Sequence, residues 1–451
     1  MPRFAFYLKS DLDLETTEMC AGTVLKPLYG SAALRTAAPQ PDIRLQCVRV
    51  EAADTLGKSD PQLGTTRIRA GPDLWKDAIR WRWSPAVGLA AVRKQASVPA
   101  QRDMGTTAAL AEFVGESFAK PAERDILTLW GHGGASLMAL TLVPPGAVPG
   151  ASARPGPAGA RAAPAARPAR ELVAGLGLFE AAHSLVDAAN QALGTNPGRL
   201  SVGQVAAGLH DGLQGTRLDA LLLCECQMAS LEVAWEYRAH ARYLIASEEL
   251  LSATQWPHAD WLAWCAAHPD VPTTALLSAL LDQFDVLARR GLDTYTLSCI
   301  DLDRLGPLAT GLDALATAFG AATDREWRAA LDARGALRVF GTPQAPVLTV
   351  DLVTFLTTLA GRLPKGAPTL TSVRSCLGAA TAAIADNRSG QANATGLSIY
   401  FPATARDAAR ADPHGTYWPQ SGNAPAFSRE HLWVKFLAGF HDAARRLNRA
   451  S

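Results

Sequence analysis

The sequence predicts an α/β fold in which a mostly parallel sheet is covered by helices on both faces. Strand-like and helix-like segments alternate along the chain, which is the order that builds a parallel sheet. Two strand-like segments, 125–130 and 219–223, are mostly apolar, as buried strands are. With 451 residues, of which 48% are hydrophobic and 19% charged, the chain is long enough to bury a large core.

The first part of the chain follows this alternation up to a segment that has no clear pattern. The periodicity predicts strands at 4–9, 43–50, 65–69 and 125–130, the start of a helix at 11–15 and a helix at 106–118. Residues 70–103 contain three Trp and several Pro and Gly without clean periodicity, so no element is predicted there.

The rest of the chain predicts more helix than strand. Helices are predicted at 172–193, 202–213, 230–240, 273–290, 305–319, 324–334, 350–361, 372–386 and 429–447, and strands at 219–223, 243–247, 295–300 and 396–401. Residues 143–170 are rich in Pro, Ala, Gly and Arg with almost nothing to bury, which indicates a disordered or polyproline-rich insert.

Composition excludes several classes of protein. The formal charge of +1 and the dispersed Lys and Arg residues argue against a nucleic-acid partner. No uninterrupted apolar run approaches ~18 residues, so no membrane span is expected, and the N-terminus lacks the form of a signal peptide. Seven irregularly spaced cysteines are not a disulfide framework, which favours a reducing cytoplasm. The oligomeric state is not predicted.

Two strand ends carry the residues of a nucleophilic site. One predicted strand is followed by Cys224 and Cys226, and the other by His132 among three glycines. Parallel neighbours would bring these ends to one edge of the sheet, where open α/β sheets carry their sites. A following helix N-terminus would stabilise a thiolate there, and a Cys with an imidazole base is the minimal apparatus of a cysteine peptidase.

At this point the chain resembles the clostripain-like cysteine peptidases, which share the caspase-type fold. The resemblance lies in an ordered set of blocks that spans most of the chain: Phe4–Glu15, Asp103–Phe113, Leu127–Gly134, Leu222–Glu236, Tyr243–Glu249, Thr296–Leu302 and Thr395–Pro402. It implies a caspase-like sheet in two halves, 1–142 with His132 and 171–305 with Cys226. The insert at 143–170 links them, and residues 306–451 form a C-terminal α+β region packed on the sheet.

The resemblance also implies the catalytic roles. Cys226 is the nucleophile, His132 the general acid and base, and the amides of Gly133 and Cys226 form the oxyanion hole. Cys224 is the nucleophile instead if the register slips by two residues. A zinc site at Cys224, Cys226 and His132 lacks a second ligand pair, and C-x-C is not the usual redox motif. No metal or other cofactor is expected, and Ca²⁺ dependence cannot be read from the sequence.

Two departures from the family bear on specificity. Cys224 stands where the family usually has the Asp that favours a basic substrate side chain, and Leu250–Trp256 replaces a Gly-rich segment beside the cleft. Candidate substrate-binding residues are Cys224, Glu248, Glu249, Trp256 and Asp260. A solvated loop for the acidic residues, and core packing for Trp256 and Trp261, remain the alternatives.

The insert carries candidate processing sites at Arg154, Arg161, Arg167 and Arg170. Cleavage there would leave two pieces held together by the sheet, whereas a passive linker is the alternative. The predicted function is a cysteine endopeptidase acting on a protein or peptide substrate, with a role in cell death or defence by analogy. The alternatives are a catalytically silent module that binds an extended peptide and a thiol hydrolase of non-peptide amides.

Overall fold

The predicted α/β fold is confirmed by the computed structural model. It describes residues 2–9, 20–47, 78–101, 104–120, 122–131, 200–251, 256–291, 294–341, 348–412, 415–421 and 424–449. The elements predicted at 11–15, 65–69 and 172–193, together with the insert at 143–170, lie outside these residues. In the described part of the chain, no helix combines the length and the apolar character that a membrane crossing needs.

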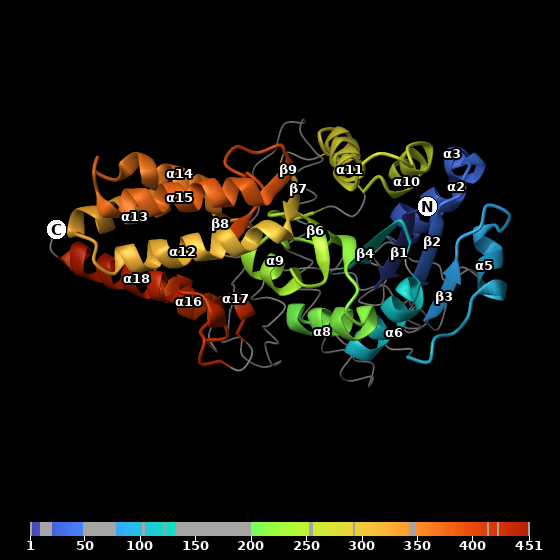
Figure 1. Cartoon of the computed structure of the whole chain (residues 1–451), viewed down its shortest axis with the longest axis horizontal. Helices are drawn as coiled ribbons and strands as arrows, with labels where there is room; N and C mark the ends of the chain where they lie inside the picture. The colour runs from blue at the N-terminus through green and yellow to red at the C-terminus, as the bar shows by residue number, and fades with distance from the viewer. Residues whose placement is uncertain are drawn as a thin grey trace, which may run out of the picture.

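An eight-stranded sheet forms the centre of the molecule (Figure 1). Its strand order is β3-β2-β1-β4-β5-β6-β7-β9. The neighbours from β2 to β6 are parallel, whereas β3 pairs antiparallel with β2, β7 with β6, and β9 with β7. The strands are β1 (Pro2–Leu8), β2 (Asp42–Cys47), β3 (Ile79–Arg82), β4 (Arg124–Trp130), β5 (Leu218–Cys224), β6 (Ala241–Ala246), β7 (Thr296–Asp301) and β9 (Ile384–Ser389).

Alternation along the strands divides the core between the two faces of the sheet. In β1, Phe4, Phe6 and Leu8 join one buried cluster, whereas Ala5 and Tyr7 join the other. The first cluster is covered by η1 (Ala21–Leu25), α2 (Lys26–Gly30), α3 (Ala32–Thr36), α5 (Leu89–Gln95), α10 (His258–Ala267) and α11 (Thr273–Ala288). The second is covered by α6 (Thr107–Phe118), α8 (Val202–Leu213) and α9 (Leu231–Tyr237).

The C-terminal region extends from the β7 side of the sheet and forms the other half of the molecule (Figure 1). Its apolar side chains continue the cluster that α6, α8 and α9 cover, so the two halves share one core. Its elements are η3 (Leu302–Arg304), α12 (Leu305–Phe319), α13 (Asp324–Gly335), β8 (Thr349–Asp351), α14 (Leu352–Arg362), α15 (Pro368–Ala383), β10 (Ser398–Tyr400), α16 (Ala405–Ala411), α17 (Ala426–Glu430) and α18 (Trp433–Arg449). Strands β8 and β10 form a separate antiparallel pair.

The structure corrects three of the predicted elements. Residues 70–103, for which no element was predicted, contain β3 and α5, which are too short to show periodicity. The helix predicted at 372–386 ends at Ala383, and β9 follows as an edge strand paired with β7. The helix predicted at 429–447 is two helices, because Asp313 accepts hydrogen bonds from His431 and the Leu432 amide between them.

Helices α6 and α8 pack closely through glycine. A Cβ at Gly212 would lie 2.7 Å from the Val114 Cβ and 2.8 Å from the Ala111 carbonyl oxygen, whereas one at Gly203 would meet nothing within 4 Å. We expect Gly212→Ala to destabilise the chain by about 1–3 kcal/mol, because the helices must separate. In the same helix, Gly203→Ala should be neutral or stabilise by up to about 1 kcal/mol. Denaturant unfolding measures both; equal effects would contradict this account.

Candidate active site

The ends of β4 and β5 lie side by side at one edge of the sheet. The two strands are parallel and in register, with Trp130 opposite Cys224. Both side chains belong to the buried cluster under α10 and α11, so they lie on the same face. Each strand is therefore followed, two residues later, by one member of the predicted dyad. Cys226 is described by the structure, whereas His132 and Gly133 lie outside the described residues.

Cys226 differs from the other cysteines in its exposure. None of the seven cysteines forms a disulfide, and six of them are buried, whereas Cys226 is half-buried. The next residue, Gln227, is buried and has φ +59°, a left-handed conformation that costs energy for a residue with a Cβ. Strained backbone of this kind is concentrated at functional sites. Of the thiols in this chain, the structure thus offers the Cys226 thiol to a reagent or substrate.

The loop of residues 247–251 holds the turn of residues 226–229. The Gln227 amide donates to the Glu249 carbonyl at 3.1 Å, and the Ala229 amide donates to the Ser247 carbonyl at 2.8 Å. The Leu251 amide donates to the Cys226 Sγ at 3.2 Å, and the Cys226 thiol donates to the Leu251 carbonyl at 3.5 Å. Both the backbone beside Cys226 and its sulfur are therefore fixed by one loop.

Burial dominates the electrostatics of the Cys226 thiol. It raises the pKa of Cys226 to about 11, an effect that the Leu251 contact partly offsets and the negative charges of Glu225 and Glu249 reinforce. Burial also raises the pKa of Glu225 to about 8, so this carboxyl is largely protonated at neutral pH. The prediction of a thiolate stabilised by a helix N-terminus is wrong here, because α9 begins only at Leu231, with Ser230 as its N-cap.

A contact between a cysteine and a histidine lies at the end of β5. The Cys224 Sγ is 4.0 Å from the Nε2 of His258, and both side chains are buried. Burial lowers the pKa of His258 to about 3 and raises that of Cys224 well above its usual value, so both groups are neutral. The pair is not a thiolate–imidazolium dyad. The sequence did not indicate His258, because 34 positions separate it from Cys224 and only the fold brings the two side chains together.

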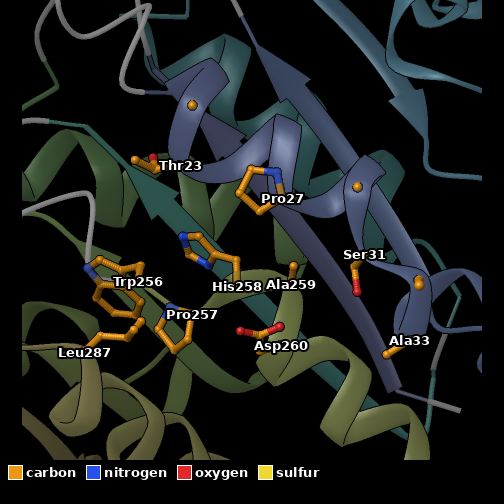
Figure 2. A pocket seen from close by; sticks show the side chains of 13 residues that line it. Thr23, Pro27, Ser31, Ala33, Trp256, Pro257, His258, Ala259, Asp260 and Leu287 are labelled. Atoms are coloured by element: carbon orange, nitrogen blue, oxygen red, sulfur yellow. The ribbon is translucent and has the colours of Figure 1, made fainter.

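His258 and Trp256 also form part of the wall of a surface pocket of about 920 Å³ (Figure 2). Trp256 stacks on His258 with ring centroids 5.6 Å apart and an interplanar angle of 13°. The segment at the start of α10 lines one side and α2 and α3 line the other, with Asp260 exposed at the rim. Two predicted substrate-binding residues, Trp256 and Asp260, therefore line the same cavity as His258, and Trp261 is buried in the core.

Glu248 and Glu249 are buried and bonded to the C-terminal region. The Glu248 Oε2 accepts from the Gly396 amide at 2.8 Å, and burial and the charge of Asp351 raise its pKa well above the usual range. The Glu249 carboxylate accepts from Arg338, the Gly341 amide and the Leu250 amide. These contacts favour a structural role for both residues over the predicted contact with substrate. They also exclude the alternative of a solvated loop.

The predicted processing sites of the insert, which are Arg154, Arg161, Arg167 and Arg170, lie outside the described residues. Within the described part of the chain, no cluster of three or more His, Cys, Asp or Glu residues is placed to hold a metal ion.

Comparison with known proteins identifies the family that this site resembles. The clostripain family model matches residues 193–339, which include β5, Cys226 and the 247–251 loop. No curated protein is similar enough in sequence to match the chain. The family match confirms the predicted resemblance and, with it, the predicted enzyme class, a cysteine peptidase.

Solved structures show the same fold at low sequence identity. One is the secreted C11 cysteine protease "iotapain" of Bacteroides thetaiotaomicron, with 12% identity, a TM-score of 0.54 and coverage of 98% of this chain and 99% of that one. A secreted C11 cysteine protease of this organism in complex with an irreversible peptide inhibitor has 11% identity, a TM-score of 0.52 and coverage of 89% and 92%. An inactive zymogen C11 protease from Parabacteroides distasonis has 13% identity, a TM-score of 0.52 and 97% coverage of both chains.

The exposure and pKa of Cys226 predict how the resting chain reacts with iodoacetamide. Because the thiolate is the reactive form, the rate should rise about tenfold per pH unit between pH 6 and 10, as expected below a pKa of about 11. Mass spectrometry should find the first modification at Cys226, and Cys226→Ala should react far more slowly, since the other cysteines are buried. A rate that levels off below pH 9 would contradict the raised pKa.

Proposed function

Because its residues 193–339 match the clostripain family of cysteine peptidases, we propose that this chain hydrolyses peptide bonds with Cys226 as nucleophile and His132 as general acid and base. One observation carries the proposal. The parallel register that sets Trp130 opposite Cys224 brings the chain segments leading to His132 and Cys226 to one sheet edge. A nucleophile and its base must meet in this way, however distant they are in sequence.

In the proposed reaction, the Cys226 sulfur attacks the substrate carbonyl carbon, and His132 accepts the thiol proton. Collapse of the tetrahedral intermediate breaks the peptide C–N bond, and His132 gives the proton to the departing amine. Water then hydrolyses the thioester, with His132 as base. The neutral Cys226 thiol of this structure fits a mechanism in which the base removes the proton at attack, after substrate displaces Leu251 from the sulfur.

The amides of Cys226 and Gly133 are proposed to stabilise the oxyanion. The Cys226 amide makes no hydrogen bond to another residue in the described part of the chain, so a substrate oxygen would not compete with such a partner. One such donor typically contributes about 3 kcal/mol to transition-state stabilisation. This chemistry uses side chains and backbone amides alone and calls for no cofactor.

The substrate is proposed to be a protein or peptide, as the peptide inhibitor bound to a similar structure suggests. The neutral Cys224–His258 pair beneath the nucleophile offers no negative charge to a basic side chain. A substrate side chain next to the scissile bond would therefore meet no ionised group at Cys224, and the cleavage profile determines which residue is preferred there. A role in regulated proteolysis during cell death or defence is proposed by analogy, and a cytoplasmic location because none of the seven cysteines forms a disulfide.

Substitution of the dyad tests the proposal. In a peptide-library cleavage profile, Cys226→Ala should lower kcat by at least about 10⁴-fold, and His132→Ala by about 10²–10⁴-fold. A control is Cys376→Ala, which removes a buried thiol in α15 of the C-terminal region and should keep the wild-type profile. Full activity in Cys226→Ala with loss in Cys224→Ala would identify Cys224 as the nucleophile. No cleavage by the wild type would favour the silent peptide-binding module.

We further propose that the 143–170 insert is cut by the enzyme itself, next to one or more of its arginines. Support comes from the fold shared with a C11 protease that is known as an inactive zymogen. Mass spectrometry of the purified wild type should then find two fragments, whereas Cys226→Ala should stay intact. Equal intact masses for the two proteins would exclude self-cleavage and leave the insert as a passive linker.

A further inference from the structure

The backbone beside the nucleophile is in a strained conformation that needs external support. Gln227 has φ +59° and is buried, so its side chain cannot relax into solvent. A non-glycine residue keeps such a conformation only where surrounding contacts determine it. The hydrogen bond from the Gln227 amide to the Glu249 carbonyl is a contact of this kind.

Glu249 is itself fixed through both its backbone and its side chain. Its amide donates to the hydroxyl oxygens of Ser247 and Thr296 at 3.1 and 3.3 Å. One carboxylate oxygen accepts from the amides of Leu250 and Gly341 at 2.9 and 3.0 Å. The other accepts from the Arg338 guanidinium at 2.8 Å. The carboxylate is 3% exposed, so these donors replace the water it has lost.

The hydrogen bond between the Glu249 carboxylate and the Leu250 amide also helps to fix the Cys226 sulfur. The Glu249 carboxylate fixes the Leu250 amide, and the next residue, Leu251, contacts the Cys226 thiol with both its amide and its carbonyl. A shift of the carboxylate would therefore move the partner of the Gln227 amide and both partners of the thiol together.

We infer that Glu249, held by Arg338 of the C-terminal region, is a positioning residue that fixes the Cys226 thiol and the strained turn after it. The inference rests on the proposed function, since it assigns Cys226 as the nucleophile. It gives the C-terminal region a part in the active site, because Arg338 and Gly341 follow α13 in the sequence. Glu249 does not touch substrate in this account; it acts through the 247–251 loop.

The test uses paired variants of the whole chain. Arg338→Gln and Glu249→Gln remove the ion pair, and Arg338→Lys keeps the charge. Arg446→Gln is the matched control, because Arg446 pairs with Asp324 at 2.7 Å, and its side chain is 58% exposed against 56% for Arg338. Arg338→Gln alters a mostly exposed side chain, so it keeps the test open if Glu249→Gln fails to fold.

Two readouts separate positioning from general destabilisation. With iodoacetamide as the probe, Arg338→Gln should react more slowly at Cys226, about tenfold for each unit by which the thiol pKa rises, with the whole pH profile moved to higher pH, because the shifted loop no longer brings the Leu251 amide, which lowers this pKa, to the sulfur. Glu249→Gln also removes a negative charge that raises the same pKa, so kcat is the readout for both variants. On the fastest-cleaved library peptide, their kcat should fall about tenfold or more, while KM changes little, because the reacting atoms are misplaced. Arg338→Lys should recover most of both.

Alkylation profiles and kcat values of Arg338→Gln equal to those of Arg446→Gln would overturn the inference. A wild type that cleaves no peptide would refute the proposed function, but the alkylation comparison would still decide whether Glu249 and Arg338 hold the thiol. The two failures are thus distinguishable.

Discussion

Parallel pairing of β4 with β5 is the constraint on which the rest of the site depends. The register that places Trp130 opposite Cys224 determines which residues emerge together at the carboxyl edge of the sheet. A slip of one residue would exchange the two faces of β5 and move Cys224 out of the cluster under α10 and α11. Apolar packing on both faces opposes such a slip, so the core that stabilises the sheet also positions the nucleophile.

The C-terminal region contributes to this site as well as to the core. The Ser398 amide donates to the Ala229 carbonyl at 2.9 Å, directly after the turn that carries Cys226. The buried Glu232 carboxylate at the start of α9 accepts from Tyr417 and from the Tyr400 amide. Strand β10 and Tyr417 therefore bond to residues 229–232, and the 247–251 loop bonds to residues 226–229.

Burial favours the neutral forms of the titratable side chains at this edge of the sheet. Cys224, His258 and Glu225 lie close to the nucleophile, and burial shifts the pKa of each toward its neutral form. A site of this kind offers a substrate neither a strong positive nor a strong negative charge. It differs from an arrangement in which an ionised Asp occupies the position of Cys224 and attracts a basic side chain. The residue at position 224 thus decides whether an ionised group lies two positions before Cys226.

Period-two alternation and apolar runs were sufficient to predict the parallel core of the sheet, because a buried strand consists mostly of apolar residues and this pattern is visible in its own sequence. The cysteine at the end of β5 was predictable for the same reason. Short edge elements such as β3 and β9 were not, since four to six half-exposed residues carry little periodic signal. The division of the last helix at His431 also escaped, because it depends on Asp313, a residue 118 positions away.

By itself, the sequence determined that a buried strand leads into Cys224 and Cys226 and that position 224 carries no acidic residue. These are local properties, encoded in adjacent residues. Only the tertiary structure decided that Glu249 bonds to Arg338 and that His258 lies against Cys224. It alone showed that burial, rather than a helix N-terminus, sets the pKa of the thiol. Such properties depend on which distant groups the fold brings together and on how much water those groups exclude. Neither can be read from a short stretch of sequence.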